Sequence, residues 1–235
     1  MTGISSMRLW KQFESTDPAH TKKVEFGRKF TSIDAHWQIM RVTEVLGPVG
    51  GGWGYRVQHS IERLNEVLPN LVLSIADVTI WWREDGKGEQ SYGPIRGTAP
   101  LVENDKNGKP RYDDDAPKKA MTDALTKGLS HLGVSADVFL GLFDDNKYVQ
   151  RMGIQFAAHR TEQAPDMPES VKIVMRLVAA AAETAALDEL YKNSVEAMRQ
   201  MAKPHQDLLL LKFKEAKAAI IKAKLLGPPV AANAA

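Results

Sequence analysis

The chain contains no cysteine, no long apolar run and almost no excess of charge of either sign. Without cysteine it forms neither disulfides nor thiolate metal sites, which fits a reducing cytosol. No apolar stretch approaches the roughly 20 residues that a membrane span needs, and the N-terminal segment lacks the apolar core of a signal peptide. We therefore expect a soluble cytoplasmic protein with no membrane partner.

The net charge of this 235-residue chain is only +2. A nucleic-acid-binding function cannot be inferred from that total and would require cations gathered on one surface. The hydrophobic content of 43% and the charged content of 26% are ordinary for a folded protein.

The clearest element is a helix between Asp113 and Gly133. Asp114 or Asp115 can cap its first turn, Pro117 fits that turn, and Gly133 is suited to the position just after its end. Apolar residues recur at the helical period, and we expect this stripe to pack on a sheet: Met121, Leu125, Leu129 and Leu132, with Ala120, Ala124 and Gly128 beside them. The opposite face holds Lys119, Asp123, Thr126, Lys127 and Ser130.

Lys118 and Lys119 stand in the first turn of this helix, where the helix dipole disfavours cations. Two interpretations are open. The lysines can pair with the aspartates just before them, or they can join the free N–H groups in binding an anion.

A second basic cluster lies upstream and contains Lys22, Lys23, Arg28 and Lys29, with Phe26 inside it and Phe30 directly after it. Cations beside aromatic rings are typical of surfaces that bind single-stranded nucleic acid. The alternative is a solvated segment that buries its two phenylalanines.

The remaining pattern predicts an α+β fold: an antiparallel β-meander packed against a central helix, followed by a helical C-terminal module. A helix capped by Thr31 or Ser32 precedes the meander, with Trp37, Met40, Val45 and Leu46 on its buried side. Strands begin at Trp53 and return through Gln90–Ile95, and Arg96–Lys109 is expected to be a loop. We expect four segments: an arm (1–27), the α+β core (28–156), a polar linker (157–168) and the helical module (169–235).

No catalytic set, metal-ligand spacing or nucleotide-binding loop is evident, so we expect a protein that is not an enzyme and needs no cofactor or metal. One alternative is a metal-dependent nuclease using Asp113–Asp115 or Asp144 and Asp145. Another is a structural phage protein that oligomerises and does not bind DNA.

The segment KKAMTDALTKGLSHLG resembles the hallmark helix of the Rad-fifty-two-type single-strand annealing proteins, which include the Sak-like phage recombinases. Their pattern is close to K-x-A-V-T-D-G-L-K-R-A-L-R-S-F-G. The matching residues here are Lys118, Ala120, Thr122, Asp123, Leu125, Lys127, Leu129 and Gly133. LFDDNKYV and the segment from Ile33 to Trp53 also resemble parts of that family, so the resemblance covers roughly residues 25–150.

This resemblance implies ATP-independent binding of single-stranded DNA and annealing of complementary strands during phage recombination, in the cytoplasm of a bacterial host. It also implies a homo-oligomeric ring or filament that carries the annealed duplex as an intermediate. A host single-strand-binding protein is the expected partner of the C-terminal helices. The implied DNA-binding residues, with Arg96, Lys118 and Lys119 as compensating cations, are Arg28, Lys29, Phe30, Arg96, Lys118, Lys119, Thr126, Lys127 and Ser130. Thr126 and Ser130 stand where that family usually has basic residues.

Overall fold

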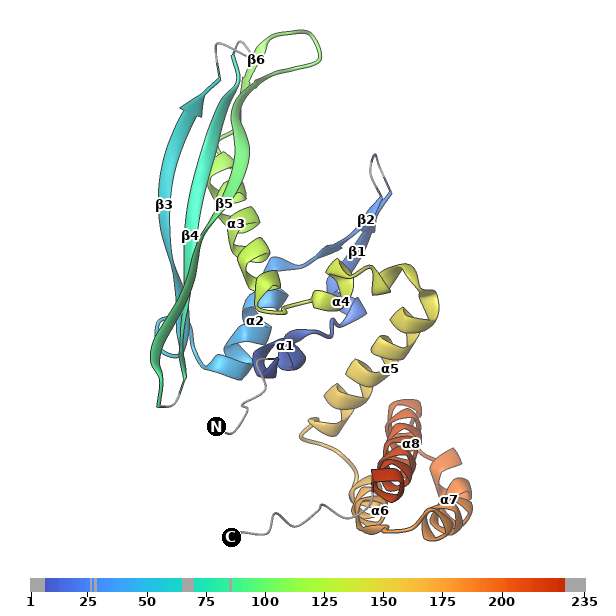
Figure 1. The fold of residues 1–235 in the computed structure, drawn as a ribbon. Helices are drawn as coiled ribbons and strands as arrows, with labels where there is room; N and C mark the ends of the chain where they lie inside the picture. Colours follow the sequence, from blue (N-terminus) through green and yellow to red (C-terminus); the bar gives the residue numbers. More distant parts are fainter. Residues whose placement is uncertain (1–6, 26, 28, 65–69, 85, 227–235) are drawn as a thin grey trace. The chain divides into compact units, whose positions relative to one another are not determined.

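The computed structural model of the chain describes residues 7–25, 27, 29–64, 70–84 and 86–226. They divide into two compact units, residues 1–149 and 150–235. The first unit is α+β, as predicted, and the second is helical (Figure 1). The elements of the first unit are α1 (Arg8–Phe13), the 3₁₀ turn η1 (Pro18–His20), β1 (Thr21–Val24), β2 (Phe30–Ile33), α2 (Ala35–Leu46), β3 (Trp53–Arg63), β4 (Val72–Glu84), β5 (Gly88–Asn104), β6 (Pro110–Tyr112), α3 (Ala116–His131), α4 (Ala136–Phe139) and η2 (Leu142–Asp144).

The predicted meander is a curled antiparallel sheet in which β3, β4, β5 and β6 lie in chain order. α3 packs on one face of this sheet, against β4 and β5 (Figure 1). The main core of the unit lies between them and is formed by large residues of both layers together with residues of α1 and α2: Phe13, Val42, Trp53, Val78, Ile80, Leu125 and Leu129.

The prediction of a loop at Arg96–Lys109 is wrong for its first nine residues, because β5 continues as a strand to Asn104. A close approach between the strand and α3 explains the glycine at position 97. A Cβ atom at Gly97 would lie only 2.2 Å from the carbonyl oxygen of Ala120 and 2.4 Å from the amide nitrogen of Ala124. Gly97 is therefore a packing residue that lets α3 lie directly on β5.

The central helix begins and ends close to the predicted residues. Pro117 occupies its first turn, and Gly133 follows its end with φ of +100°. Asp115 holds the N-cap position but its side chain makes no capping hydrogen bond. The residues that face the sheet are smaller than predicted, because Ala116, Ala120, Ala124 and Gly128 form the buried line alongside Leu125 and Leu129. Met121 and Leu132 are only partly buried.

The helix before the meander starts later than expected. Asp34 caps α2 by accepting a hydrogen bond from the His36 amide, whereas Thr31 and Ser32 belong to β2. Trp37 and Val42 are buried in α2, but Met40 is 44% exposed and does not join the buried side.

Residues that were expected to form an arm instead contribute a strand. β1 pairs antiparallel with β2 in a separate two-stranded hairpin. In Figure 1 this hairpin projects from the body of the unit, and α3 lies between it and the sheet.

The second unit consists of helices, as predicted for the C-terminal module. It contains most of α5 (Asn146–Glu162), then α6 (Glu169–Ala180), α7 (Thr184–Arg199) and α8 (Lys203–Leu226). The boundary at 149/150 falls inside α5, so the expected linker at 157–168 begins as helix. None of the helices that the structure describes is long and apolar enough to cross a membrane.

Candidate nucleic-acid interface

The β1–β2 hairpin gathers cations beside an exposed aromatic ring. Lys22 is paired with Ser32, and Val24 is paired with Phe30. Directly opposed residues in an antiparallel pair share a face, and alternate residues along a strand return to that face. Lys22 and Phe30 therefore lie on one face of the hairpin, and Lys23 lies on the other. Phe30 is 55% exposed, so its ring is accessible to a ligand.

The lysines of this hairpin are exposed cations. Within the described parts of the chain, Lys22, Lys23 and Lys29 form no ion pair with a carboxylate, and all three are exposed. Sequence reasoning placed Lys29 and Phe30 in the site but left Lys22 outside it. Pairing of the segments TKKV and FTSI would have identified Lys22 as a site residue, because it puts Lys22 beside Ser32 and on the face of Phe30. Arg28 and Phe26 lie outside the described residues.

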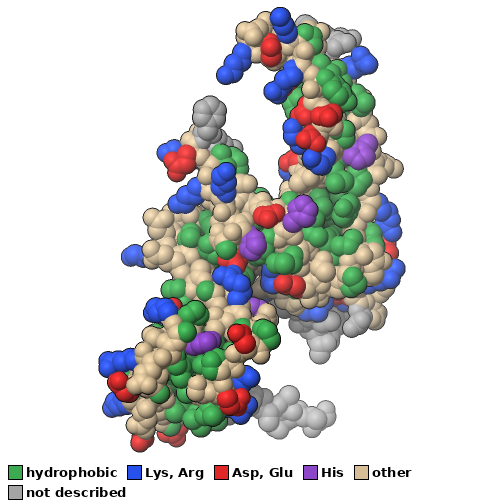
Figure 2. Space-filling model, turned by 180° about the vertical axis from the view of Figure 1, so that it is seen from behind, with side chains coloured by type: hydrophobic (Ala, Val, Ile, Leu, Met, Phe, Trp, Pro, Cys, Tyr) green, Lys and Arg blue, Asp and Glu red, His purple; other side chains and the backbone are tan. Residues whose placement is uncertain are grey.

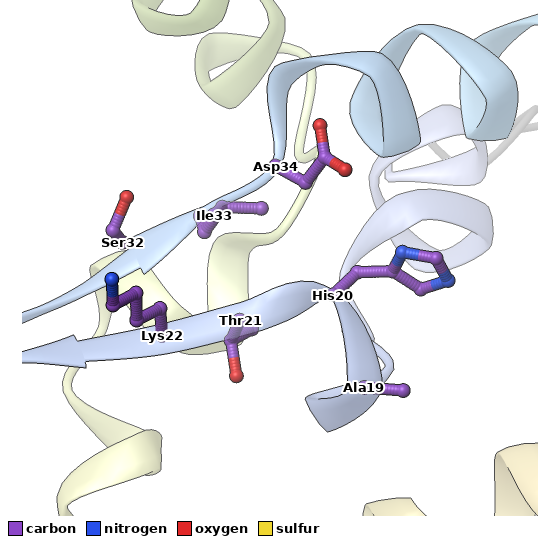
Figure 3. Close-up of a pocket in the computed structure, with 7 residues that line it drawn as sticks. All are labelled: Ala19, His20, Thr21, Lys22, Ser32, Ile33 and Asp34. Carbon is purple, nitrogen blue, oxygen red and sulfur yellow. The ribbon is translucent and has the colours of Figure 1, made fainter.

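A pocket of about 250 Å³ lies at the base of the hairpin. Its lining residues are Ala19, His20, Thr21, Lys22, Ser32, Ile33 and Asp34 (Figure 3). Figure 3 shows the Lys22 and Ser32 side chains next to each other on one side of the hairpin, while Thr21 is directed to the other side. Asp34 adds a carboxylate at the α2 end, so an anion is favoured only at the Lys22–Ser32 end of the pocket.

The polar face of α3 carries the predicted residues Lys119, Thr126, Lys127 and Ser130. The two lysines are exposed, and Thr126 and Ser130 are half-buried. Lys127 lies 3.9 Å from Asp123, at the outer limit of an ion pair. The hydroxyl of Thr126 donates to the carbonyl of Thr122 at 2.9 Å, and that of Ser130 donates to the carbonyl of Lys127 at 2.7 Å. These two hydroxyls use their protons within the helix, so Lys127 is the principal cation in the middle of this face.

The lysine pair at the start of α3 is bound to the preceding aspartates. Lys118 Nζ lies 2.7 Å from Asp115 Oδ1, and Lys119 Nζ lies 2.5 Å from Asp113 Oδ2. The hydrogen bond that Lys119 donates lowers the pKa of Asp113, and the hydrogen bond that Lys118 donates to Asp115 raises the pKa of Lys118. Of the two interpretations, the aspartate-paired one describes this structure. A phosphate at this end would have to compete with both carboxylates.

Arg96 does not join the cations of α3. Its neighbours Ile95 and Gly97 face α3, so Arg96 projects from the opposite face of the sheet. There it forms a two-pronged contact with Asp77, with Nε–Oδ1 of 2.9 Å and Nη2–Oδ2 of 2.8 Å. Hydrogen bonding to Arg96 lowers the pKa of Asp77. Arg96 is therefore both neutralised and remote from the expected groove face.

Charge is interspersed over the face drawn in Figure 2, where blue and red side chains lie next to one another. The same view shows that the hairpin and the upper sheet diverge and leave an open space between them. A DNA-binding surface on this face would therefore depend on a few exposed lysines and not on a continuous basic patch.

Three of the five carboxylates considered for a nuclease, Asp113, Asp115 and Asp145, are engaged in structural contacts. Asp113 binds Lys119, and Asp145 accepts a hydrogen bond from the Lys147 amide at 2.8 Å. Across the residues with described positions, no group of three His, Asp or Glu side chains could hold a metal ion.

Comparison with known proteins gives no family assignment: no family model matches the chain, and no curated protein sequence matches it.

Proposed function

We propose that this protein binds single-stranded DNA and anneals complementary strands without ATP, as a homo-oligomer that acts in phage recombination. The observation that carries the proposal is the face shared by Lys22 and Phe30. An unpaired ammonium group and an accessible ring on one face can bind a phosphate and an unstacked base of the same strand.

The phosphate contacts assigned to this site are sequence-independent. Lys22 and Lys29 on or beside the hairpin, and Lys127 on α3, are exposed cations that can follow a DNA backbone. Contacts from these lysines to phosphates would carry no information on base sequence. Annealing needs this property, because any sequence must bind and its bases must remain available for pairing.

The fold supports the same proposal. A helix, an antiparallel meander and a central helix follow one another in the order of the annealing family that the α3 motif resembles. Figure 2 shows the open space between the hairpin and the sheet as a notch. We assign the DNA path to this space, with the hairpin on one side.

Oligomerisation compensates for a weak single site. The site has few unpaired cations, since Lys118 and Lys119 are bound to aspartates. Copies arranged along one strand would raise the overall affinity through effective concentration, without any new contact in each copy. We further propose that a host single-strand-binding protein docks on the helices of the second unit.

Oligonucleotide binding tests this function. The purified full-length protein should retain a labelled single strand at low salt, prefer it to a matched duplex, and sediment as an oligomer. A protein that ignores both nucleic acids at low salt contradicts the proposal and favours a structural role. Cleavage of the labelled strand after addition of Mg²⁺ or Mn²⁺ favours the nuclease alternative.

A further inference from the structure

The last helix presents an exposed face that carries both aliphatic and cationic side chains. α8 buries Leu208, Leu209, Phe213 and Ile220 in the core of the second unit. At 100° per residue, the face turned away from that core follows a different set of positions. We name the exposed residues at these positions the α8 stripe: Leu210, Lys214, Lys217, Ile221, Lys224 and Leu225.

The aliphatic members of the α8 stripe are well exposed. Leu210 is 42% exposed, Ile221 is 45% exposed and Leu225 is 81% exposed. Asp207, one turn before Leu210 on the same face of α8, is bound to Lys203 at 2.8 Å, and Glu215 lies on another face. Lys214 and Lys224 make no ion pair within the described chain, whereas Lys217 binds Asp188 of α7 at 2.7 Å. The surface therefore combines apolar area with positive charge.

We propose that the α8 stripe is a docking site for an acidic amphipathic peptide segment of a partner protein. Its carboxylates would meet the lysines, and its apolar side chains would cover Leu210, Ile221 and Leu225. The stripe spans the 16 residues from Leu210 to Leu225, or about 22 Å at a rise of about 1.5 Å per residue. This proposal concerns a surface outside the DNA-binding site and does not depend on it.

Two other occupants fit less well. A nucleic-acid backbone is a continuous run of phosphates and would leave the three aliphatic side chains of the stripe uncovered. An identical α8 face from a second copy would place lysines opposite lysines, which is unfavourable. An acidic and apolar partner satisfies both components of the stripe.

The test uses the full-length protein and a labelled synthetic helical peptide of about 16 residues, long enough to cover the stripe, with glutamate and leucine at matching spacing. A peptide with lysine in place of each glutamate is its control. Fluorescence anisotropy should show salt-sensitive binding of the acidic peptide only.

Matched variants locate the binding. Ile221→Ser and Lys214→Glu should each weaken binding of the peptide by about fivefold or more, or roughly 1 kcal/mol. Two control variants lie elsewhere: Ile173→Ser on α6, where the isoleucine is 47% exposed, and Lys192→Glu on α7. Each should change the affinity for the peptide by less than about twofold. All four positions are exposed, so circular dichroism should show unchanged helix content.

Three results would overturn the proposal. The first is absence of acidic-peptide binding at low salt, or equal loss in the stripe and control variants. The second is loss of oligonucleotide binding in Ile221→Ser, which would assign the stripe to nucleic acid. The third is loss of self-association in that variant, which would assign it to a second copy.

Discussion

Lys22 and Phe30 lie on the same face of the β1–β2 hairpin, because Lys22 is paired with Ser32 and Phe30 with Val24. Lys23, one residue away in the sequence, lies on the other face. This arrangement distinguishes two adjacent lysines that no compositional argument separates. It also makes the proposed DNA contact testable one side chain at a time.

Replacing Phe30 with alanine should weaken binding of a single-stranded oligonucleotide by roughly tenfold or more, because stacking of a base on an aromatic ring contributes about 1–3 kcal/mol. Anisotropy titration measures the loss. Phe139→Ala is a matched control, since Phe139 is 58% exposed and lies in α4. An oligonucleotide without bases should bind wild type and Phe30→Ala equally, and a difference there would argue against stacking.

Lys22→Ala should weaken the same oligonucleotide and reduce the slope of log K against log salt by about 0.7, the value expected for one phosphate contact on a single strand. Lys23→Ala removes the same charge from the other face and should have a smaller effect. Equal losses in the two variants would mean that the hairpin contributes only general positive charge.

On α3, Lys127→Ala should weaken binding by a similar factor for every sequence tested, because a phosphate contact carries no base information. Arg96→Ala is the control, since Arg96 is bound to Asp77 on the other face of the sheet. Titrations with several unrelated oligonucleotides measure both variants. Unchanged binding in Lys127→Ala would remove α3 from the DNA path.

Asp113→Asn should tighten oligonucleotide binding by a few-fold. The pKa of Asp113 is lowered by Lys119, so this carboxylate is ionised at neutral pH and holds the ammonium group of Lys119. Removing its charge frees a cation on the proposed groove face. Asp77→Asn changes the net charge equally but frees Arg96 on the opposite face. Equal tightening in both variants would show that only net charge matters.

Gly97→Ala should destabilise the first unit by at least about 1–3 kcal/mol, because its methyl group would overlap the backbone of α3 at Ala120 and Ala124. Urea unfolding followed by tryptophan fluorescence measures this, since all five tryptophans lie in residues 1–149. Gly153→Ala in α5 meets nothing within 4 Å and should instead raise helix stability by about 0.5–1 kcal/mol, measured by circular dichroism. An unchanged free energy of unfolding in Gly97→Ala would contradict the packing described for α3 on β5.

The sequence predicted the central helix well because its two ends carry distinct signals. Pro117 and Gly133 are local features that do not depend on tertiary structure. The side of the helix that meets the sheet was less predictable, since the spacing of apolar residues does not show whether large or small ones make the closest contact. Gly97 on β5 decides this, and it lies 23 residues before Ala120 in the chain.

The hairpin and the position of Arg96 were harder to predict for physical reasons. β1 and β2 are each four residues long and mostly polar, so they lack the alternation that marks a half-buried strand. Arg96 was expected to support the groove, but its face depends on register. A β-bulge between Val78 and Ile80 shifts the pairing of β4 with β5, and no local pattern revealed it.

The rate of strand annealing tests the central proposal most directly. Two complementary labelled oligonucleotides are mixed with the full-length protein in the absence of nucleotide, and duplex formation is followed by energy transfer between their labels. We expect faster annealing with the protein than in buffer for any pair of complementary sequences. Most of this acceleration should be lost in a double variant that combines Lys22→Ala with Phe30→Ala. An annealing rate equal to that of the strands alone, at concentrations where the protein is folded, would contradict it.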